Sequence, residues 1–482
     1  MKISKKLAQS LKPYLGIFYL LPRNIRRQYY ITILLAGLVG FLEIFSLSAI
    51  LIFLNSQTNT QNSFYKFIPQ NLFRLVDSSE LLVLTLFLFV LKTIFVLVVL
   101  KFINRISLKS KRFFQNKIFQ NFMNSPFDKQ ILFGSSEIIR TITLDCLNLE
   151  NRIFSPVLTI LGEIIPSVFI CSLLLLINYQ VFLIILFIYI FAAIAIYLYS
   201  NKRILKLGEE LLIADDLMVK NIVDSYKGIR ELKIYNLKEW SINNLKKYSL
   251  NSVIAGNKSF LITSLPRYGF EICIYIALGL MFLIYFSKGS DFIEIISELL
   301  VFGTAATRLL PSVSRIVSHF QYLRQGLPII NSVNNHLNNF KPEKINNKNF
   351  QKNDFLFKEL EIIDLDFSYN KKLILKSINC RIKAGDKFAI VGQSGNGKST
   401  LMNICLSLLI PSKGKILLNK KEIKDIKEEF WNKIGYVPQD SFLIDKTLIE
   451  NLMINKNYIE VKDIDKAKDL LYEFNLPEDF IE

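Results

Sequence analysis

The chain has 482 residues, of which 51% are hydrophobic and 13% aromatic, and its 59 lysine and arginine residues against 41 acidic residues give a formal net charge of +18. This apolar content excludes a disordered chain and is untypical of a soluble globular protein. The five cysteines lack CxxC spacing and the two histidines lie apart, which indicates neither a disulfide scaffold nor a zinc site. Long apolar stretches fill positions 31 to about 316, so we predict a membrane domain followed by a soluble module.

Six apolar segments are candidates for membrane-spanning helices, because about 20 apolar residues cross roughly 30 Å of hydrocarbon. They cover residues 31–54, 81–102, 154–177, 181–199, 268–286 and 292–316, and the last is more polar than the others. The segments on the cytoplasmic side keep helical periodicity, so we expect them to extend the spans as long helices. Between the first two spans, residues 64–75 fit either a short amphipathic helix on the outer leaflet or an irregular loop.

The distribution of lysine and arginine predicts the orientation of the spans, since basic loops remain in the cytoplasm. Residues 1–30 contain seven basic residues and no acidic one, and residues 103–153 and 200–264 each carry excess positive charge. The alternate loops, 55–80, 178–180 and 287–291, are neutral. We therefore expect residues 1–30 to form a cytoplasmic segment and 31–340 to form the membrane domain. Because most of the excess charge is topological, no nucleic-acid partner is expected.

The soluble module is expected at residues 355–482, behind a linker at 341–354 that is rich in lysine and asparagine. Strand-like runs at 360–367 and 373–382 precede a predicted strand at 387–391, the sequence GQSGNGKST and an apolar helical run at 399–410. The motif GxxxxGK[ST] between a strand and a helix is the P-loop, whose backbone N–H groups close around phosphate oxygens. The residues expected to contact a nucleotide are Gly392, Gln393, Ser394, Gly395, Asn396, Gly397, Lys398, Ser399 and Thr400.

With this module behind six spans, the chain resembles the ATP-binding cassette (ABC) exporters, in their half-transporter form with fused membrane and nucleotide-binding domains. The resemblance implies a membrane α-helical bundle plus an α/β P-loop NTPase domain, ATP and Mg²⁺ as cofactors, and a homodimer. It assigns Ser399 and Gln439 to Mg²⁺ and Tyr369 to stacking on adenine, although a tyrosine in the domain core is an alternative. Residues 127–145 and 224–235 resemble the family's coupling segments, for which plain helix packing is the alternative.

The sequence departs from the family after Gln439. It contains no signature loop of the LSGGQ type, no Walker B aspartate with a following catalytic glutamate, and no switch histidine. We therefore expect the nucleotide-binding domain to be incomplete, as a gene fragment or a partial product, and to be inactive in hydrolysis alone. A relic that only binds nucleotide is one alternative that follows.

Charged residues inside the spans bear on what is carried, because such charges are expensive in a membrane and usually functional. Residues 266–271 and 306–316 resemble stretches of the lipid-linked oligosaccharide flippases, in which basic residues are thought to engage a pyrophosphate. This resemblance makes Arg267 and Arg308 candidate substrate residues, together with Lys92, which matches at single positions only. It implies export or flipping of a lipid-linked sugar or other lipid across the inner (plasma) membrane of a bacterium. Pairing of these cations with glutamates would instead favour an exporter of peptides, drugs or plain lipids.

Overall fold

The structure is a computed structural model that describes residues 12–58, 78–287, 292–342, 356–369, 372–439, 441–454 and 460–474. The chain divides into two compact units, Met1–Asn346 and Asn347–Glu482. Residues 64–75, which the sequence predicts as either a short amphipathic helix or an irregular loop, lie outside the described residues.

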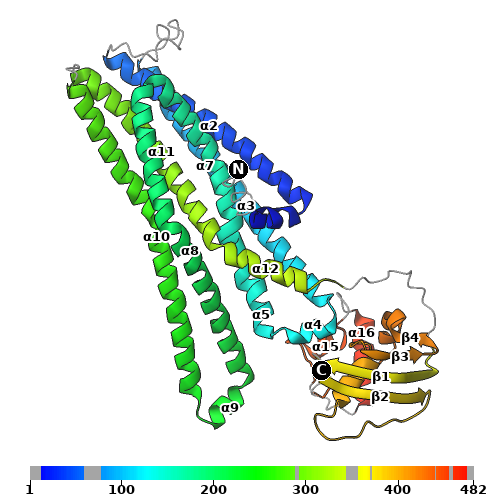
Figure 1. Ribbon diagram of the computed structural model, residues 1–482. Helices are drawn as coiled ribbons and strands as arrows, with labels where there is room; N and C mark the ends of the chain where they lie inside the picture. The colour runs from blue at the N-terminus through cyan, green and yellow to red at the C-terminus, as the bar shows by residue number, and fades with distance from the viewer. Residues whose placement is uncertain are drawn as a thin grey trace. The chain divides into compact units, whose positions relative to one another are not determined.

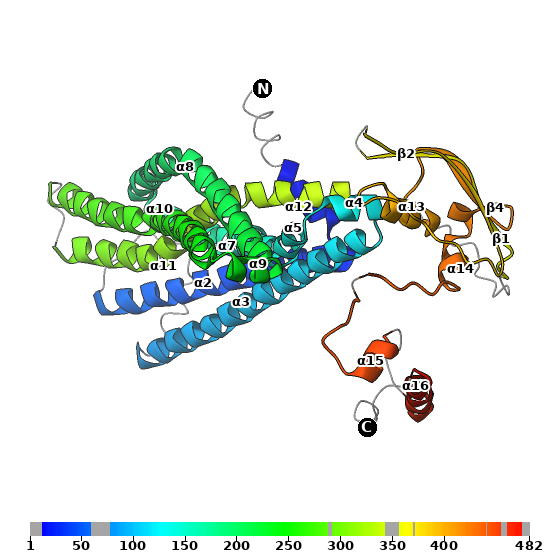
Figure 2. The same cartoon turned by 90° about the horizontal axis from the view of Figure 1, so that it is seen from below.

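The first unit is built from long helices (Figure 1). These are α2 (Arg23–Thr58), α3 (Ser78–Met123), α7 (Ser155–Ile177), α8 (Tyr179–Lys227), α10 (Lys238–Ser287) and α11 (Phe292–Gln325). Helices α8 and α10 run unbroken for 49 and 50 residues. At about 1.5 Å per residue they are more than twice as long as a bilayer core requires. The prediction of long helical extensions is therefore confirmed, and Figure 2 shows the same helices from below.

Five of the described helices are long and apolar enough to cross a membrane: Arg23–Ser46, Val83–Met123, Ser135–Ile177, Tyr179–Lys227 and Lys238–Ile284. The predicted sixth span lies within α11, a continuous helix of 34 residues that is not among these five. Its polar residues have a place in the fold, because Thr307, Arg308, Ser312 and Arg315 line a cavity between helices. The sixth span stays a prediction.

Short elements occupy the ends of the long helices. Between α3 and α7 the chain forms α4 (Phe127–Leu132), α5 (Ser135–Arg140), η3 (Thr141–Asp145), α6 (Cys146–Leu149) and η4 (Glu150–Phe154), and both η elements are π-helical. Helix α9 (Ile229–Ile234) joins α8 to α10, and α12 (Leu327–Asn339) follows α11. The buried Ile330 and Val333 of α12 pack into the same apolar cluster as Phe114 and Phe154. This cluster therefore fixes α12 on the bundle.

The second unit contains a four-stranded antiparallel sheet in the order β2-β1-β3-β4. Its strands are β1 (Glu359–Tyr369), β2 (Lys372–Lys383), β3 (Lys413–Leu418) and β4 (Lys421–Glu422). Leu360, Ile362, Leu365 and Phe367 of β1 are buried, and a register shift between Ile362 and Leu365 keeps them on one face. The predicted strand-like runs at 360–367 and 373–382 thus become the centre and one edge of the sheet.

The remaining elements of the second unit are helical. They are α13 (Lys398–Cys405), η5 (Ile423–Asp425), α14 (Lys427–Trp431), α15 (Leu448–Leu452) and α16 (Val461–Glu473). Helix α13 ends at Cys405 rather than at residue 410, and Ser407 two residues later has a left-handed φ of 56°.

The predicted strand at 387–391 is wrong for this structure, because these residues form no strand, and neither do residues 434–437. A strand needs a neighbour for its backbone hydrogen bonds. Neither segment pairs with another strand within the described part of the second unit. Val391 and Val437 are accordingly 92% and 91% exposed.

Candidate functional site

The P-loop takes its shape from two glycines. Gly395 and Gly397 have φ values of +87° and +81°, in the left-handed region that other residues adopt only with strain. A Cβ at Gly397 would lie 2.9 Å from Ile374 Cγ2 and 3.0 Å from Leu375 Cδ2, both side chains of β2. Gly397 therefore allows both the turn and the close approach to the sheet. Helix α13 begins at the next residue, and Leu401 N–H donates to the Gly397 carbonyl at 2.8 Å.

The ammonium group of Lys398 is held over the loop by the loop's own carbonyl oxygens. Its Nζ donates to the carbonyls of Gly392 and Gln393, each at 2.8 Å. The positive end of α13 and this cation lie together, which is the arrangement that attracts phosphate. The exposed hydroxyl of Ser399 in the first turn of α13 is a hard oxygen ligand of the kind that suits Mg²⁺. The loop can therefore hold an anionic phosphate chain and its counter-ion.

Tyr369 and Gln439 both lie at the surface of the second unit. Tyr369 ends β1, is 37% exposed and meets the buried Phe367 edge-on, with ring centroids 4.8 Å apart. Because part of the Tyr369 ring is open to solvent, it is available for stacking rather than enclosed in the core. Gln439 is exposed on the stretch that follows α14. Their assigned contacts with adenine and Mg²⁺ stay predictions.

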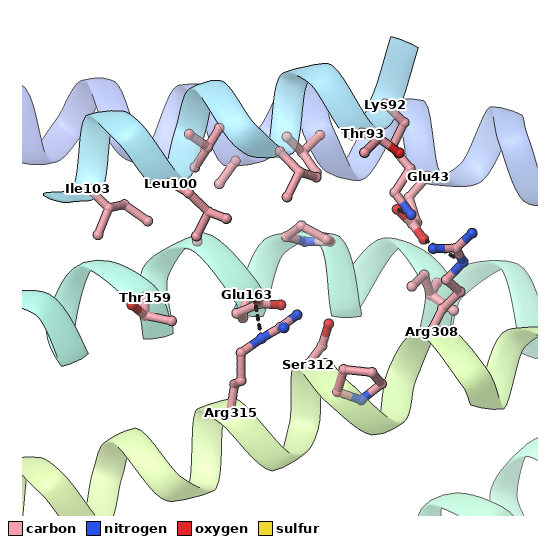
Figure 3. A pocket seen from close by; sticks show the side chains of 18 of the residues that line it. Glu43, Lys92, Thr93, Leu100, Ile103, Thr159, Glu163, Arg308, Ser312 and Arg315 are labelled. Atoms are coloured by element: carbon pink, nitrogen blue, oxygen red, sulfur yellow. Dashed lines mark ion pairs between the residues drawn. The ribbon is translucent and has the colours of Figure 1, made fainter. Parts of the chain in front are cut away.

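A cavity of about 350 Å³ lies between α2, α3, α7 and α11 of the first unit. Five charged side chains line it, and Figure 3 shows them converging from four helices: Glu43, Lys92, Glu163, Arg308 and Arg315. Lys92 forms an ion pair with Glu43 Oε2, and Arg308 Nε lies 3.7 Å from Glu43 Oε1. Arg315 Nε lies 2.7 Å from Glu163 Oε1. The cavity therefore combines three cations with two anions.

The structure brings together only part of the predicted substrate set. Lys92 and Arg308 meet at Glu43, whereas Arg267 is an exposed residue of α10 that is not among those lining the cavity. The Arg267 guanidinium lies 5.9 Å from the ring centroid of the neighbouring Tyr268. Sequence reasoning did not single out Arg315. Its spacing of seven residues, two helical turns, from Arg308 was the signal that could have found it.

A second cavity, of about 210 Å³, lies between α7, α8, α10 and α11 and is almost wholly apolar. Its lining includes Leu174, Phe182, Tyr189, Phe302 and Leu309. Helix α11 borders both cavities, with Arg308 facing the charged one and the adjacent Leu309 facing the apolar one. One helix thus separates two spaces of opposite chemistry.

The tip between α8 and α10 exposes apolar side chains. Helix α9 has no buried residue, and Tyr226 and Tyr235 beside it are 82% and 71% exposed. Exposed apolar groups gathered at a loop tip mark interaction sites. The tip coincides with the second predicted coupling segment, and α4, α5 and η3 form the first, but contacts of either with a nucleotide-binding domain stay predictions.

Comparisons with known proteins agree with this arrangement. A family model described as ABC transporter matches residues 375–480. The lactococcin-G-processing and transport ATP-binding protein LagD of Lactococcus lactis subsp. lactis is 27% identical over 340 residues, which cover 69% of this chain and 47% of that protein. The ATP-dependent lipid A-core flippase of Desulfotalea psychrophila is 34% identical over 113 residues, 23% of this chain and 20% of that protein.

The match to these relatives is partial, since the chain spans about half or less of their length. Among solved structures, a bacterial Atm1-family ABC exporter with ATP bound superposes with a TM-score of 0.73. That match covers 96% of this chain and 80% of the other. Because the sequence identity is 16%, the match supports the fold alone. The chain therefore consists of a helical membrane-type domain followed by an ABC transporter domain, which is the type of domain that binds ATP. Together they have the fold of an ABC exporter.

Proposed function

We propose that this protein takes part in the ATP-driven export or flipping of an amphipathic substrate, with a lipid-linked sugar or another lipid as the favoured class. The observation that carries the proposal is the pair of cavities on either side of α11. A charged cavity suits a polar head group and the adjoining apolar cavity suits a hydrocarbon chain. Lys92 and Arg308 lie at the head-group end, and Arg267 stays a predicted substrate residue outside the lining of this cavity.

The P-loop supplies the energy-coupling half of this proposal. Loop N–H groups and Lys398 bind the β- and γ-phosphates of ATP, Ser399 and Gln439 contact Mg²⁺, and Tyr369 stacks on adenine. Mg²⁺ neutralises phosphate charge when bound. These two residues fit Mg²⁺, because the Ser399 hydroxyl and the Gln439 amide oxygen would fill two of its coordination positions. The other positions would go to phosphate oxygens and water, as Mg²⁺ prefers. Residues 1–30, 31–340, 341–354 and 355–482 then serve as cytoplasmic segment, membrane domain, linker and nucleotide-binding domain.

Two copies of the chain work together in this proposal, as a homodimer in a bacterial inner membrane with both nucleotide-binding domains in the cytoplasm. Its support is the exposed apolar tip around α9, which offers a surface for another domain, and the excess of lysine and arginine in the cytoplasmic segments. Alternating access of the two membrane domains then moves the substrate.

Export of peptides or drugs by the same architecture is the second candidate. Two observations favour it. Lys92 and Arg308 are both paired with Glu43, so the cavity is less basic than its cations alone suggest. In addition, a relative that matches 69% of this chain is named for processing and transport of lactococcin G.

Vesicles test the proposal. The full chain is reconstituted with ATP and Mg²⁺, and its binding of a short-chain fluorescent phospholipid is compared with its binding of a labelled hydrophobic peptide, because the chain alone is expected to be inactive in hydrolysis. Binding of the lipid together with binding of labelled ATP, the latter abolished by Lys398→Ala, is the expected result. Binding of the peptide without binding of the lipid would favour the second candidate, and failure of labelled ATP to bind would contradict the nucleotide half.

A further inference from the structure

We propose that Arg308 is the exchangeable cation of the charged cavity. It moves away from Glu43 and binds a compact anionic group on an amphipathic ligand. Lys92 makes this exchange possible without contacting the ligand. The inference rests on the proposed function, because it names the substrate class of the same cavity. Its basis is that Lys92 and Arg308 share one carboxylate, Glu43, whereas Arg315 pairs with a different carboxylate, Glu163.

Glu43 is the centre of the arrangement because it has two positive partners. Its side chain is 6% exposed and pairs with Lys92 from α3 and Arg308 from α11. A buried carboxylate that loses its only counter-ion is strongly destabilised. When Arg308 moves away, however, Glu43 keeps Lys92, so no uncompensated charge remains. Arg308 can therefore leave at low energetic cost.

Lys92 lacks this freedom. Its side chain is 9% exposed, and Glu43 is the carboxylate with which it pairs. Moving Lys92 toward a ligand would break a buried ion pair and leave Glu43 with Arg308, whose Nε is 3.7 Å away. Lys92 is thus a positioning residue that keeps Glu43 neutralised.

Arg315 is also held in place. It lies 2.7 Å from Glu163, and the structure gives Glu163 no second cation among its ion pairs with described residues. If Arg315 turned to a ligand, Glu163, whose side chain is 18% exposed, would stay unpaired. Arg308 by contrast has the longer contact and is 38% exposed, and its guanidinium also lies 4.9 Å from the ring centroid of Phe89, a cation–π contact that does not involve Glu43.

The ligand chemistry follows from the guanidinium and its surroundings. A guanidinium binds phosphate or carboxylate oxygens through two parallel N–H donors. Hydroxyls of Thr93, Thr159 and Ser312 line the same cavity and suit a glycerol or sugar next to such a group. Leu309 faces the apolar cavity one residue further on. The site therefore fits an amphiphile with one compact anion between its polar head and its chain and with no cationic group of its own to neutralise that anion, which describes phosphatidylglycerol and not zwitterionic phosphatidylcholine.

Binding to the purified full chain in phosphatidylcholine nanodiscs, without nucleotide, tests the exchange. The probes are fluorescent phosphatidylglycerol, fluorescent phosphatidylcholine and unlabelled glycerol 3-phosphate as competitor. Arg308→Gln should weaken phosphatidylglycerol binding about tenfold, which is about 1.4 kcal/mol, and leave phosphatidylcholine binding unchanged. Glu43→Gln should strengthen phosphatidylglycerol binding because it releases Arg308. Lys92→Met should weaken it, because Arg308 becomes the sole partner of Glu43.

The double variant Glu43→Gln/Lys92→Met decides the role of Lys92. If Lys92 only neutralises Glu43, this variant binds phosphatidylglycerol at least as well as the unchanged chain. If it binds as weakly as Lys92→Met alone, Lys92 is itself a ligand and the exchange is wrong. Lys206→Gln/Glu210→Gln, which removes an exposed ion pair of α8 outside the cavity and so one charge of each sign, is the matched control and should bind both lipids normally.

Two further outcomes are informative. Competition by glycerol 3-phosphate as strong as by the lipid would overturn the amphiphile and indicate a site for free phosphate esters. Equal loss of both lipids in Arg308→Gln would indicate a folding defect, and Arg308→Lys then repeats the test with charge retained. Because no nucleotide is present, failed ATP binding would contradict the proposed function without affecting this result.

Discussion

The imidazole ring of His336 donates from Nε2 to the hydroxyl oxygen of Thr141, at 2.9 Å. The direction is settled by Thr141, whose hydroxyl proton is used on the Glu137 carbonyl at 2.9 Å. Among the described residues the ring's Nδ1 is buried without a hydrogen-bond partner. The ring also contacts Phe133 and Phe340, with centroids 5.5 and 5.9 Å away. His336 is therefore a neutral ring that ties α12 to η3.

Acid should loosen this tie. Burial, and secondarily the charge of Arg140, lower the pKa of His336 from 6.5 to about 4. The Glu137 carboxylate lies 3.3 Å from Nε2, yet it forms an ion pair only with a protonated ring, which neutral pH does not provide. Since the unfolded chain takes up its proton first, the stabilisation is complete above about pH 6.5 and is lost as pH falls toward 4.

We predict that the free energy of unfolding falls by about 2 kcal/mol between pH 7 and pH 5 through His336 alone. His336→Phe keeps the ring contacts and removes the titration, so its melting temperature should change less over this range. Thermal melting in detergent at each pH measures the difference. Thr141→Val, which leaves the histidine in place, is the control and should keep a pH dependence. Equal pH slopes for His336→Phe and the unchanged chain would contradict the assignment.

A second prediction concerns Arg140 of α5, whose guanidinium contacts carboxylates of η3 and α8. Its Nη1 donates to both oxygens of Asp145 at 2.9 and 3.0 Å, and its Nε lies 2.8 Å from Asp216 Oδ1. Ser332 of α12 donates to Asp145 Oδ2 at 2.9 Å. Asp145→Ala should lower the free energy of unfolding by about 3 kcal/mol, because a buried arginine loses its main counter-ion.

Two comparisons make the test of Arg140 specific. Arg140→Met/Asp145→Leu should recover part of the loss, since neither charge then remains buried. Glu210→Ala removes the exposed Lys206–Glu210 pair, with atoms 3.8 Å apart, and should change stability by less than about 1 kcal/mol. Denaturant unfolding of the detergent-solubilised chain measures all three. A loss in Glu210→Ala as large as in Asp145→Ala would contradict the role given to burial.

Helices and motifs that depend on residues close together in the sequence could be predicted from it. Contacts that depend on which faces of two helices meet could not. The long helices α8 and α10 follow from apolar and helical periodicity, and the P-loop follows from its glycines. The pairing of Lys92 with Glu43 requires knowing which faces of α2 and α3 meet, which no local pattern specifies. The strand expected at 387–391 failed for a related reason, because strands need partners from elsewhere.

A third prediction compares the two P-loop glycines. Alanine at Gly395 meets only the strain of a left-handed φ, about 1 kcal/mol, because no atom lies within 4 Å of its added Cβ. Alanine at Gly397 meets the same strain and also crowds Ile374 and Leu375. Both variants should bind labelled ATP more weakly, and Gly397→Ala should also lower the melting temperature clearly more. Equal melting temperatures would contradict the contact between the loop and β2.

The last prediction sets two helix glycines against each other. Glycine to alanine inside a helix usually stabilises a protein by up to about 1 kcal/mol, because alanine has the higher helix propensity. Gly256 of α10 should follow this rule, since nothing lies within 4 Å of its added Cβ. Gly208 of α8 should not, because its Cβ would lie 2.4 Å from the carbonyl oxygen of Gln325, a backbone atom at the end of α11.

Gly208→Ala must therefore push α8 and α11 apart, and we expect it to destabilise the protein by about 2 kcal/mol, as overpacking does. Thermal and denaturant unfolding of both variants in the same detergent give the comparison. The expected result is a change of opposite sign in the two, which is hard to obtain from propensity or from detergent effects alone. If Gly208→Ala is as stable as Gly256→Ala, the close approach of α8 to the end of α11 is not present in solution.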